Sequence, residues 1–345
     1  MRRARLAAML AVTALAGCAK PAPDAVATSP AYLVYATNER SGDVSVIDPD
    51  QRKEIGRIAI GKRPRGLVAS PDGRFLYVAV SGSPAAGPGV DESKLPPADK
   101  AADGIVVIDL ATRKLLRTLR GISDPEQVAI SADGEQLYVA SEDTGELVVL
   151  KRQGGIAGRL RVGGEPEGIG LSPDGAVVLA TSEEDHSVAI VRGTPPAVIG
   201  RIEVGQRPRN VAFLDQNRAI VPGEFDASLS LVDVANARRV RTITLAKADR
   251  PMGVARLDAH TALVTTGRSG RLVRVDVDAQ RPETGSVDVG PRPWGLTIAP
   301  DHALAFTANG PSNDIAIVDP ATMTLVGKVK VGDGPWGVLA VATPR

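Results

Sequence analysis

A short motif centred on proline recurs seven times along this chain and constrains its fold more than any other feature. The consensus is Gly-x-x-Pro-x-Gly followed by an aliphatic residue, and successive prolines stand 61, 41, 42, 43, 42 and 42 residues apart. A period near 42 residues favours four-stranded propeller blades over helical repeats. The prolines are Pro64, Pro125, Pro166, Pro208, Pro251, Pro293 and Pro335.

Each repeat has the pattern of four strands joined by turns. After the motif comes a short apolar run such as residues 67–69, then a turn such as Ser70-Pro71-Asp72-Gly73, and then a second run at 75–79. Proline at the second turn position followed by Asp-Gly is a strong turn signal. A third run ends in an aspartate such as Asp48, which we expect to cap a hairpin turn. A fourth run then leads into the next motif.

The two ends of the repeat array complete one another. Residues 31–60 supply the second, third and fourth strands of a blade, and residues 338–342 supply its first strand. The sequence therefore predicts an all-β fold, a single seven-bladed β-propeller over residues 31–345. We expect its N- and C-terminal strands to pair within one blade, because closure removes the exposed edges of an open sheet.

The N-terminus has the pattern of a bacterial lipoprotein signal. Basic residues precede an apolar stretch at 6–14 that is too short to span a bilayer, and Leu15-Ala16-Gly17-Cys18 follows. We predict a signal peptide at 1–17 and a tether at 18–30 that is lipidated at Cys18. A chance cysteine beside an ordinary signal peptide is the alternative. With Ala19 next, the expectation is a periplasmic protein anchored to the outer membrane, whose only membrane contact is the lipid.

One repeat is about 20 residues longer than the others. The extra residues lie at 81–104, between the second and third strands of their blade, and are rich in proline and glycine. A tolerated surface insertion and a lid or partner contact both fit this pattern.

The variable positions of the motif all lie on one rim of a propeller. Loops from the fourth to the first strand share a face with loops from the second to the third strand, around the mouth of the central channel. The residues after each proline are Arg65, Glu126, Glu167, Arg209, Met252, Trp294 and Trp336, and those before it are Arg63, Asp124, Glu165, Arg207, Arg250, Arg292 and Gly334.

These positions hold the only two tryptophans of the chain beside arginines and carboxylates. A funnel with an aromatic wall, an arginine cluster and an acidic pair suits a flat or anionic small molecule. The alternative is that arginine–glutamate pairs link the blades while tryptophan plugs the channel.

Composition argues against several other classes of function. Lys and Arg number 41 against 40 Asp and Glu, which does not favour nucleic-acid binding. A single cysteine and three scattered histidines give no pattern for a zinc or haem site, and no loop has a calcium-binding pattern. We therefore expect no cofactor and no metal, and a monomer.

Several stretches resemble the YVTN β-propeller repeat. They include Tyr35-Ala36-Thr37-Asn38 and Val44-Ser45-Val46-Ile47-Asp48. Residues 309–319 and 331–338, with 61–66 and 204–209, are similar to propellers associated with pyrroloquinoline-quinone-dependent catabolism. The resemblance covers about residues 31–342. It implies a propeller fold with lactonases and haem-binding enzymes among its relatives. The 81–104 insertion, the lipid-attachment signal and the turns at 214–217 and 257–260 depart from that group.

Three functions remain open from the sequence. The first is a non-enzymatic binding or scaffold protein that takes a small molecule or a partner protein at the Pro-x-Gly face, in service of quinone-dependent oxidation. The second is a lactonase-like hydrolase with Glu126 or Glu167 as the base, while Arg65 and Arg209 polarise the carbonyl. The third is a structural surface or assembly protein.

Overall fold

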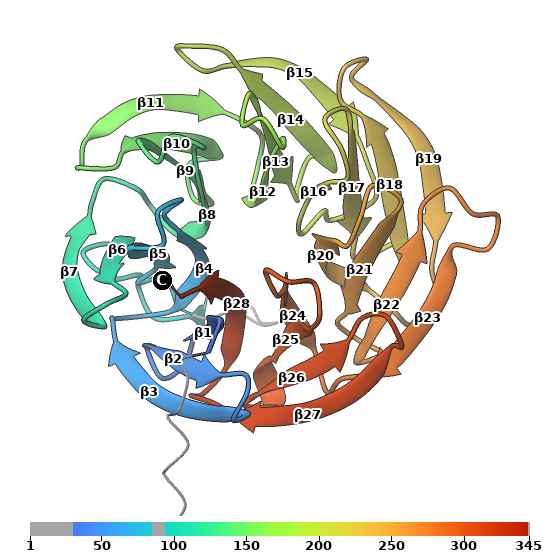
Figure 1. Cartoon of the computed structure of the whole chain (residues 1–345). Coiled ribbons are helices and arrows are strands. Elements are labelled where there is room, and N and C mark those ends of the chain that lie inside the picture. Colours follow the sequence, from blue (N-terminus) through green and yellow to red (C-terminus); the bar gives the residue numbers. More distant parts are fainter. Residues whose placement is uncertain (1–29, 85–93, 344–345) are drawn as a thin grey trace, which may run out of the picture.

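A computed structural model of the chain describes residues 30–84 and 94–343, and within these ranges the fold is a ring of seven β-sheets (Figure 1). Each sheet contains four antiparallel strands, which confirms the predicted all-β, seven-bladed propeller. The predicted signal peptide, the lipidated Cys18 and all of the tether except Pro30 lie outside the described residues. Within the described ranges we find no helix with the length and apolar character needed to cross a bilayer.

Each blade is a meander whose first strand lies nearest the channel. The first three blades contain β28 (Pro335–Ala342), β1 (Tyr32–Asn38), β2 (Asp43–Asp48) and β3 (Lys53–Ala59); β4 (Pro64–Ala69), β5 (Phe75–Val80), β6 (Gly104–Asp109) and β7 (Lys114–Leu119); and β8 (Pro125–Ile130), β9 (Gln136–Ser141), β10 (Glu146–Lys151) and β11 (Ile156–Arg161).

The next two blades contain β12 (Pro166–Leu171), β13 (Val177–Ser182), β14 (Ser187–Arg192) and β15 (Ala197–Glu203); and β16 (Ala212–Phe213), β17 (Arg218–Gly223), β18 (Ser228–Asp233) and β19 (Arg238–Thr244). The last two contain β20 (Pro251–Arg256), β21 (Thr261–Thr266), β22 (Arg271–Asp276) and β23 (Glu283–Asp288); and β24 (Pro293–Ile298), β25 (Ala305–Asn309), the 3-10 turn η2 (Gly310–Ser312), β26 (Asp314–Asp319) and β27 (Thr324–Lys330).

The ring closes as the sequence predicts. The C-terminal strand β28 pairs with the N-terminal strand β1, with Tyr32 opposite Ala342 and Tyr35 opposite Leu339. The inner edge strand of this blade is therefore supplied by the far end of the chain, and the two ends lie in the same sheet (Figure 1).

The turns follow the chemistry expected of their residues. The Asp48 side chain accepts hydrogen bonds from the backbone N–H groups of Asp50 and Gln51, at 2.9 and 3.0 Å, and so caps its hairpin turn. Asp72 accepts from the backbone N–H of Arg74 at 3.1 Å. Asp215, in one of the stretches without the Ser-Pro-Asp-Gly sequence, accepts from the N–H of Arg218 in the same way. An aspartate therefore caps this turn as well, although the Ser-Pro-Asp-Gly sequence is absent.

Apolar side chains fill the spaces between neighbouring blades. One such cluster joins Tyr77 and Ile105 of one blade to Leu137 and Leu150 of the next, and none of the four is more than 1% exposed. Burying a side chain of this size stabilises the folded state by about 1.5–3 kcal/mol. Packing between blades holds the ring rigid and fixes the loops at the channel mouth.

The glycine of the Pro-x-Gly motif is required by close packing between blades. A Cβ atom on Gly295 would lie 2.4 Å from the carbonyl oxygen of Trp336, and one on Gly253 would lie 2.4 Å from that of Trp294. Gln127 and Asn210 replace this glycine in two repeats. Where glycine is present, it packs against the carbonyl of the variable residue of the next motif, so five of the seven motifs contact the next one directly.

Candidate functional site

A cavity of about 800 Å³ opens at the channel mouth, on the face that carries the Pro-x-Gly motifs. Loops from the fourth to the first strand and loops from the second to the third strand both contribute to it, as expected from the topology. Its charged and aromatic lining comprises Glu39, Arg40, Arg63, Arg65, Lys100, Asp124, Glu142, Asp143, Glu167, Arg207, Arg209, Arg292, Trp294 and Trp336.

Most of the residues singled out from the motif line this cavity, but four do not. Met252 lines a deeper cavity within the channel. Glu126 is only 1% exposed and lies behind the wall, where it pairs with Arg65. Glu165 and Arg250 are outside both cavities, and Glu165 is exposed to solvent. The motif residues thus lie on one rim as the sequence predicts, and the packing decides which of their side chains line the cavity.

The two tryptophans form the floor of the mouth cavity. Their ring centroids are 5.4 Å apart with an interplanar angle of 33°. Below them lies the deeper cavity of about 190 Å³, and Glu167, Arg209, Trp294 and Trp336 line both spaces. These four residues form a partition across the channel, so a molecule in the mouth would rest on a floor of tryptophan rings and the charged groups beside them.

Arginines cover much of this aromatic floor. The Cζ atoms of Arg209 and Arg292 lie 4.9 and 5.4 Å from the Trp294 ring centroid, and that of Arg65 lies 5.7 Å from the Trp336 centroid. Such cation–π contacts each contribute on the order of 0.5–2 kcal/mol. They hold the guanidinium groups against the rings and so limit the directions in which the N–H groups can donate hydrogen bonds.

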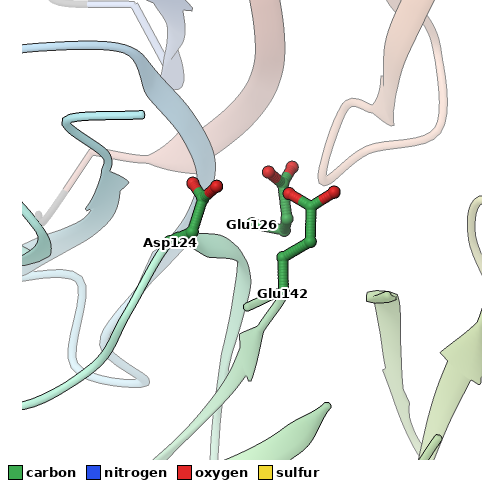
Figure 2. Close-up of side chains that lie close together, drawn as sticks. All are labelled: Asp124, Glu126 and Glu142. Carbon is green, nitrogen blue, oxygen red and sulfur yellow. The ribbon is translucent and has the colours of Figure 1, made fainter. Parts of the chain in front are cut away.

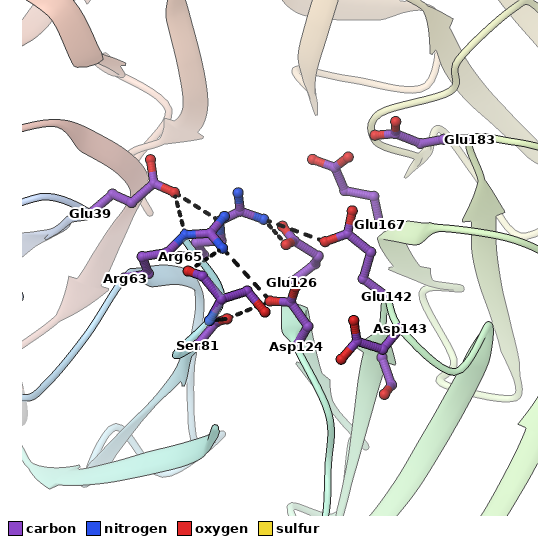
Figure 3. A network of polar contacts seen from close by, with 12 residues as sticks. Glu39, Arg63, Arg65, Ser81, Asp124, Glu126, Glu142, Asp143, Glu167 and Glu183 are labelled. Carbon is purple, nitrogen blue, oxygen red and sulfur yellow. Dashed lines mark hydrogen bonds and ion pairs between the residues drawn. The ribbon is translucent and has the colours of Figure 1, made fainter. Parts of the chain in front are cut away.

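One ion-pair network joins the first three blades, as Figure 3 shows. The Nε atoms of Arg63 and Arg65 both lie 3.1 Å from the same carboxylate oxygen of Glu39. Arg65 also pairs with Glu126, and Arg63 lies 3.9 Å from Asp124. The pairs link β1, β4 and β8 across the channel mouth, so the arrangement contains the inter-blade salt bridges that the sequence left as an alternative.

A second network centres on Arg209, whose side chain is 8% exposed. Its Nε donates to Glu224 at 2.8 Å, and its Nη1 donates to both Glu167 and Glu183. Arg207 also donates to Glu183. Buried charges of this kind persist only when they are paired, and here one guanidinium compensates several carboxylates.

Burial changes the proton affinity of two cavity carboxyls. It raises the pKa of Glu167, and the charge of Glu142 adds to this rise while Arg209 and Arg65 oppose it. Burial likewise raises the pKa of Glu142, and Asp124 adds to the rise against the opposing charge of Arg65. For Glu39 the outcome is reversed: burial favours the neutral form, but Arg65 and Arg63 outweigh it and lower the pKa.

Three carboxylates converge beside the mouth cavity, where Asp124 and Glu142 line the wall and Glu126 lies behind it. Figure 2 shows the three side chains. One oxygen from each of Asp124, Glu126 and Glu142 lies within 4.8 Å of the others, a spacing that a metal ion could bridge. The adjacent guanidinium groups of Arg63 and Arg65 already supply positive charge to this cluster. The sequence did not indicate the cluster, because its members come from one motif and from a loop 16 residues further along the chain.

The residue before each motif proline has a left-handed backbone in all seven repeats. The φ angles are positive at Arg63, Asp124, Glu165, Arg207, Arg250, Arg292 and Gly334, between 40° and 68°. Glycine adopts this region freely, whereas other residues do so at a cost on the order of 1 kcal/mol. Six of the seven positions nevertheless hold a charged residue, so the needs of the turn alone do not explain these residues.

The insertion contributes part of the cavity wall. Among its described residues, Ser83, Leu95 and Lys100 line the mouth. Lys62 pairs with Asp99 at 2.8 Å, and Lys100 pairs with Asp143 of the next blade. The described part of the insertion is thus attached to the loop that leads into its own blade and to the next blade.

The loops between the second and third strands supply the site residues that motif analysis did not select. Glu39, Glu142 and Glu183 each follow a second strand, and all three pair with or lie beside motif arginines. Their position in loops on the same face as the motif was the sequence feature that could have identified them as site residues. Which arginine each one meets depends on how neighbouring blades are packed.

No family model matches the sequence. Antigen Lp49 of Leptospira interrogans is 26% identical to the chain, and the match covers 46% of this chain and 45% of that protein. The chain therefore matches less than half the length of this relative.

Solved structures share the fold. The periplasmic gluconolactonase of Pseudomonas aeruginosa has a TM-score of 0.72 at 20% identity, with 91% of this chain and 99% of that chain covered. A Bacteroides fragilis protein described provisionally as a 6-phosphogluconolactonase has a TM-score of 0.68 at 17% identity, with 91% and 99% covered. At these identities the similarity establishes that the chain is a seven-bladed β-propeller with structural neighbours among lactonase-like propellers.

Proposed function

We propose that this propeller binds a small molecule in the mouth cavity, on the floor formed by Trp294 and Trp336, without transforming it. The observation that carries the proposal is a cavity of about 800 Å³ whose base is a pair of aromatic rings and whose walls hold charged groups. Small-molecule sites have volumes of about 300–1,000 Å³ and combine aromatic surface with a few oriented polar groups. The buried pairs that line the walls pre-organise them before a ligand arrives.

The sequence also supports a cellular setting for this binding function. We propose a periplasmic protein held at the outer membrane through Cys18, as residues 1–18 indicate. The resemblance of its repeats to propellers associated with pyrroloquinoline-quinone-dependent catabolism supports a role beside quinone-dependent oxidation. A partner protein that binds the same face, in place of a small molecule, is the other form of this binding function.

The test uses the two tryptophans as internal reporters, since the chain contains no others. A library of small polar and aromatic metabolites is screened by thermal shift and by tryptophan fluorescence. Binding to the folded state raises the melting temperature by an amount that grows with the logarithm of ligand concentration over Kd. We expect Trp294→Ala to weaken a confirmed ligand by about tenfold or more, because a buried aromatic platform is lost.

Phe225→Ala is the matched control. Phe225 is an aromatic residue on the same face that also stacks beneath arginine, but it does not line the cavity. Trp294→Phe keeps a ring on the floor and separates the loss of contact from a loss of folding. If neither Trp294→Ala nor Phe225→Ala changes the affinity of a ligand, that ligand binds outside the mouth cavity. A library without any ligand would favour the structural or assembly role.

A second function, hydrolysis of a lactone, is favoured by the raised pKa values of Glu167 and Glu142 and by neighbours that are lactonases by name. A carboxylate with a raised pKa is a stronger general base near neutral pH. It would take a proton from water as the water oxygen attacks the lactone carbonyl. The ring oxygen would then leave and take up a proton, yielding the open hydroxy acid.

The arginines are less suited to this reaction than their positions in the sequence suggested. Arg209 and Arg65 are both engaged by carboxylates, which reduces their capacity to polarise a carbonyl. Purified protein is assayed on a panel of aldonolactones alongside Glu167→Gln and Glu142→Gln. Turnover that falls about 100-fold or more in one variant would support hydrolysis, and an inactive wild type would exclude it for that panel.

A further inference from the structure

Arg292 differs from every other cationic residue that lines the mouth cavity. Arg40, Arg63, Arg65, Lys100, Arg207 and Arg209 each have a carboxylate within 4.0 Å, as the ion pairs with Asp333, Glu39, Asp143, Glu183 and Glu224 show. Across residues 30–84 and 94–343, no carboxylate lies within ion-pair distance of Arg292. Within these residues its guanidinium makes a cation–π contact with the ring of Trp294.

This arginine is held in place by its backbone and by the ring beneath it. It precedes Pro293 with φ 47°, a conformation in which glycine would be less strained. Its Cζ atom lies 5.4 Å from the Trp294 centroid. A guanidinium that lies over a ring still has N–H groups to donate, in the fork geometry that matches a carboxylate or a phosphate.

The surroundings do not neutralise this charge. Burial lowers the pKa of Arg292; the charges of Glu224 and Glu39 oppose that effect, and the like charges of Arg209 and Arg207 add to it. Glu39 is engaged by Arg63 and Arg65. Glu224 is engaged by Arg209 at 2.8 Å. A half-buried guanidinium in such a position costs free energy in the unliganded protein, and an incoming anion would remove that cost.

We propose that Arg292 is the anion-recognition point of the mouth cavity, and that the ligand carries an oxyanion, carboxylate or phosphate, which the guanidinium binds while Trp294 supports it. The inference rests on the proposed binding function and names the chemical class of its ligand. The neighbouring arginines contribute less to recognition, because their hydrogen bonds are already made to carboxylates.

The experiment measures binding of inorganic phosphate and of succinate by tryptophan fluorescence at constant ionic strength. Succinamide serves as the uncharged analogue. We expect at least one anion to bind saturably and succinamide not to bind. Arg292→Gln should weaken that anion by about 10- to 100-fold, the loss of one to two charge-assisted hydrogen bonds.

Arg192→Gln is the matched control, because Arg192 is exposed at the end of β14 on the opposite face, and it should bind as the wild type does. Arg292→Lys keeps the charge without the planar fork. It should recover more of the affinity for phosphate than for succinate, since a carboxylate depends on bidentate geometry. The anion that binds more tightly identifies which oxyanion the site prefers.

Two outcomes separate the failure of this inference from failure of the proposed function. If uncharged library ligands bind through Trp294 while neither anion depends on Arg292, the cavity binds ligands but the anion assignment is wrong. If no molecule of either kind perturbs the tryptophans of the folded protein, both proposals fall. Thermal unfolding of Arg292→Gln and Arg292→Lys verifies that each variant is folded before binding is interpreted.

Discussion

At the scale of single residues, Arg209 is the cation on which a group of buried carboxylates depends. It contacts Glu167, Glu183 and Glu224, all of which are buried. A pair of this kind adds little net stability relative to an apolar core, but removing one partner leaves the other charges uncompensated. The structural importance of Arg209 is therefore that three carboxyls depend on it.

We predict that Arg209→Gln lowers the free energy of unfolding by about 3–5 kcal/mol, because buried carboxylates lose their cation. Chemical denaturation at neutral pH measures this change. Arg192→Gln, on the opposite face, should stay within about 0.5 kcal/mol of wild type. A loss below about 1 kcal/mol for Arg209→Gln would mean that the carboxyls are neutral or solvated.

The residues of the site were only partly predictable at this scale. The motif placed Trp294, Trp336, Arg209 and Arg292 on one rim, and the structure brings them together at the cavity floor. It could not show that Arg209 is saturated with carboxylates while Arg292 has none among the described residues. That difference arises from where Glu183 and Glu224 point, which depends on blade packing.

At the scale of elements, the motif packs each blade against the next one. Gly253 and Gly295 lie against the carbonyls of Trp294 and Trp336, so each motif positions the next. The strand order and the aspartate caps of the turns were predictable because they depend on residues close to one another along the chain. Gln127 and Asn210 show that the glycine position tolerates a side chain in two blades.

We predict that Gly295→Ala destabilises the protein by about 1–3 kcal/mol, since the new methyl group would lie 2.4 Å from a backbone oxygen and the blades must separate to admit it. The shift should also alter the fluorescence of Trp336. Thermal unfolding and emission spectra measure both effects.

Gly158→Ala provides the comparison. Gly158 lies in β11, its backbone is not left-handed, and a methyl group added to it would have no other atom within 4 Å. The substitution should leave stability unchanged or slightly raised. Equal effects of the two substitutions would contradict the packing role of the motif glycine.

At the scale of the whole molecule, stability depends on closure. β28 pairs with β1 and provides the innermost strand of a blade whose other strands come from the opposite end of the chain. Without it, β1 would present unpaired backbone groups and an apolar face.

We predict that a chain ending before Pro335 fails to form a stable monomeric ring and associates through the exposed edge of β1. Size-exclusion chromatography and thermal unfolding test this, with a chain ending at Thr343 as the control that keeps β28 intact. A monomeric, cooperatively unfolding truncated chain would show that six complete blades suffice.

The sequence by itself determined the number of blades, their strand order, the closing pair and the face that carries the variable residues. These features follow from local turn chemistry and from a period that repeats along the chain. Only the tertiary structure decided which charges neutralise one another, that the tryptophans form a floor between two cavities, and that Arg292 faces the mouth without a carboxylate among the described residues. The physical reason is that each ion pair joins groups from different blades or loops, so their proximity depends on packing around the ring rather than on spacing along the chain.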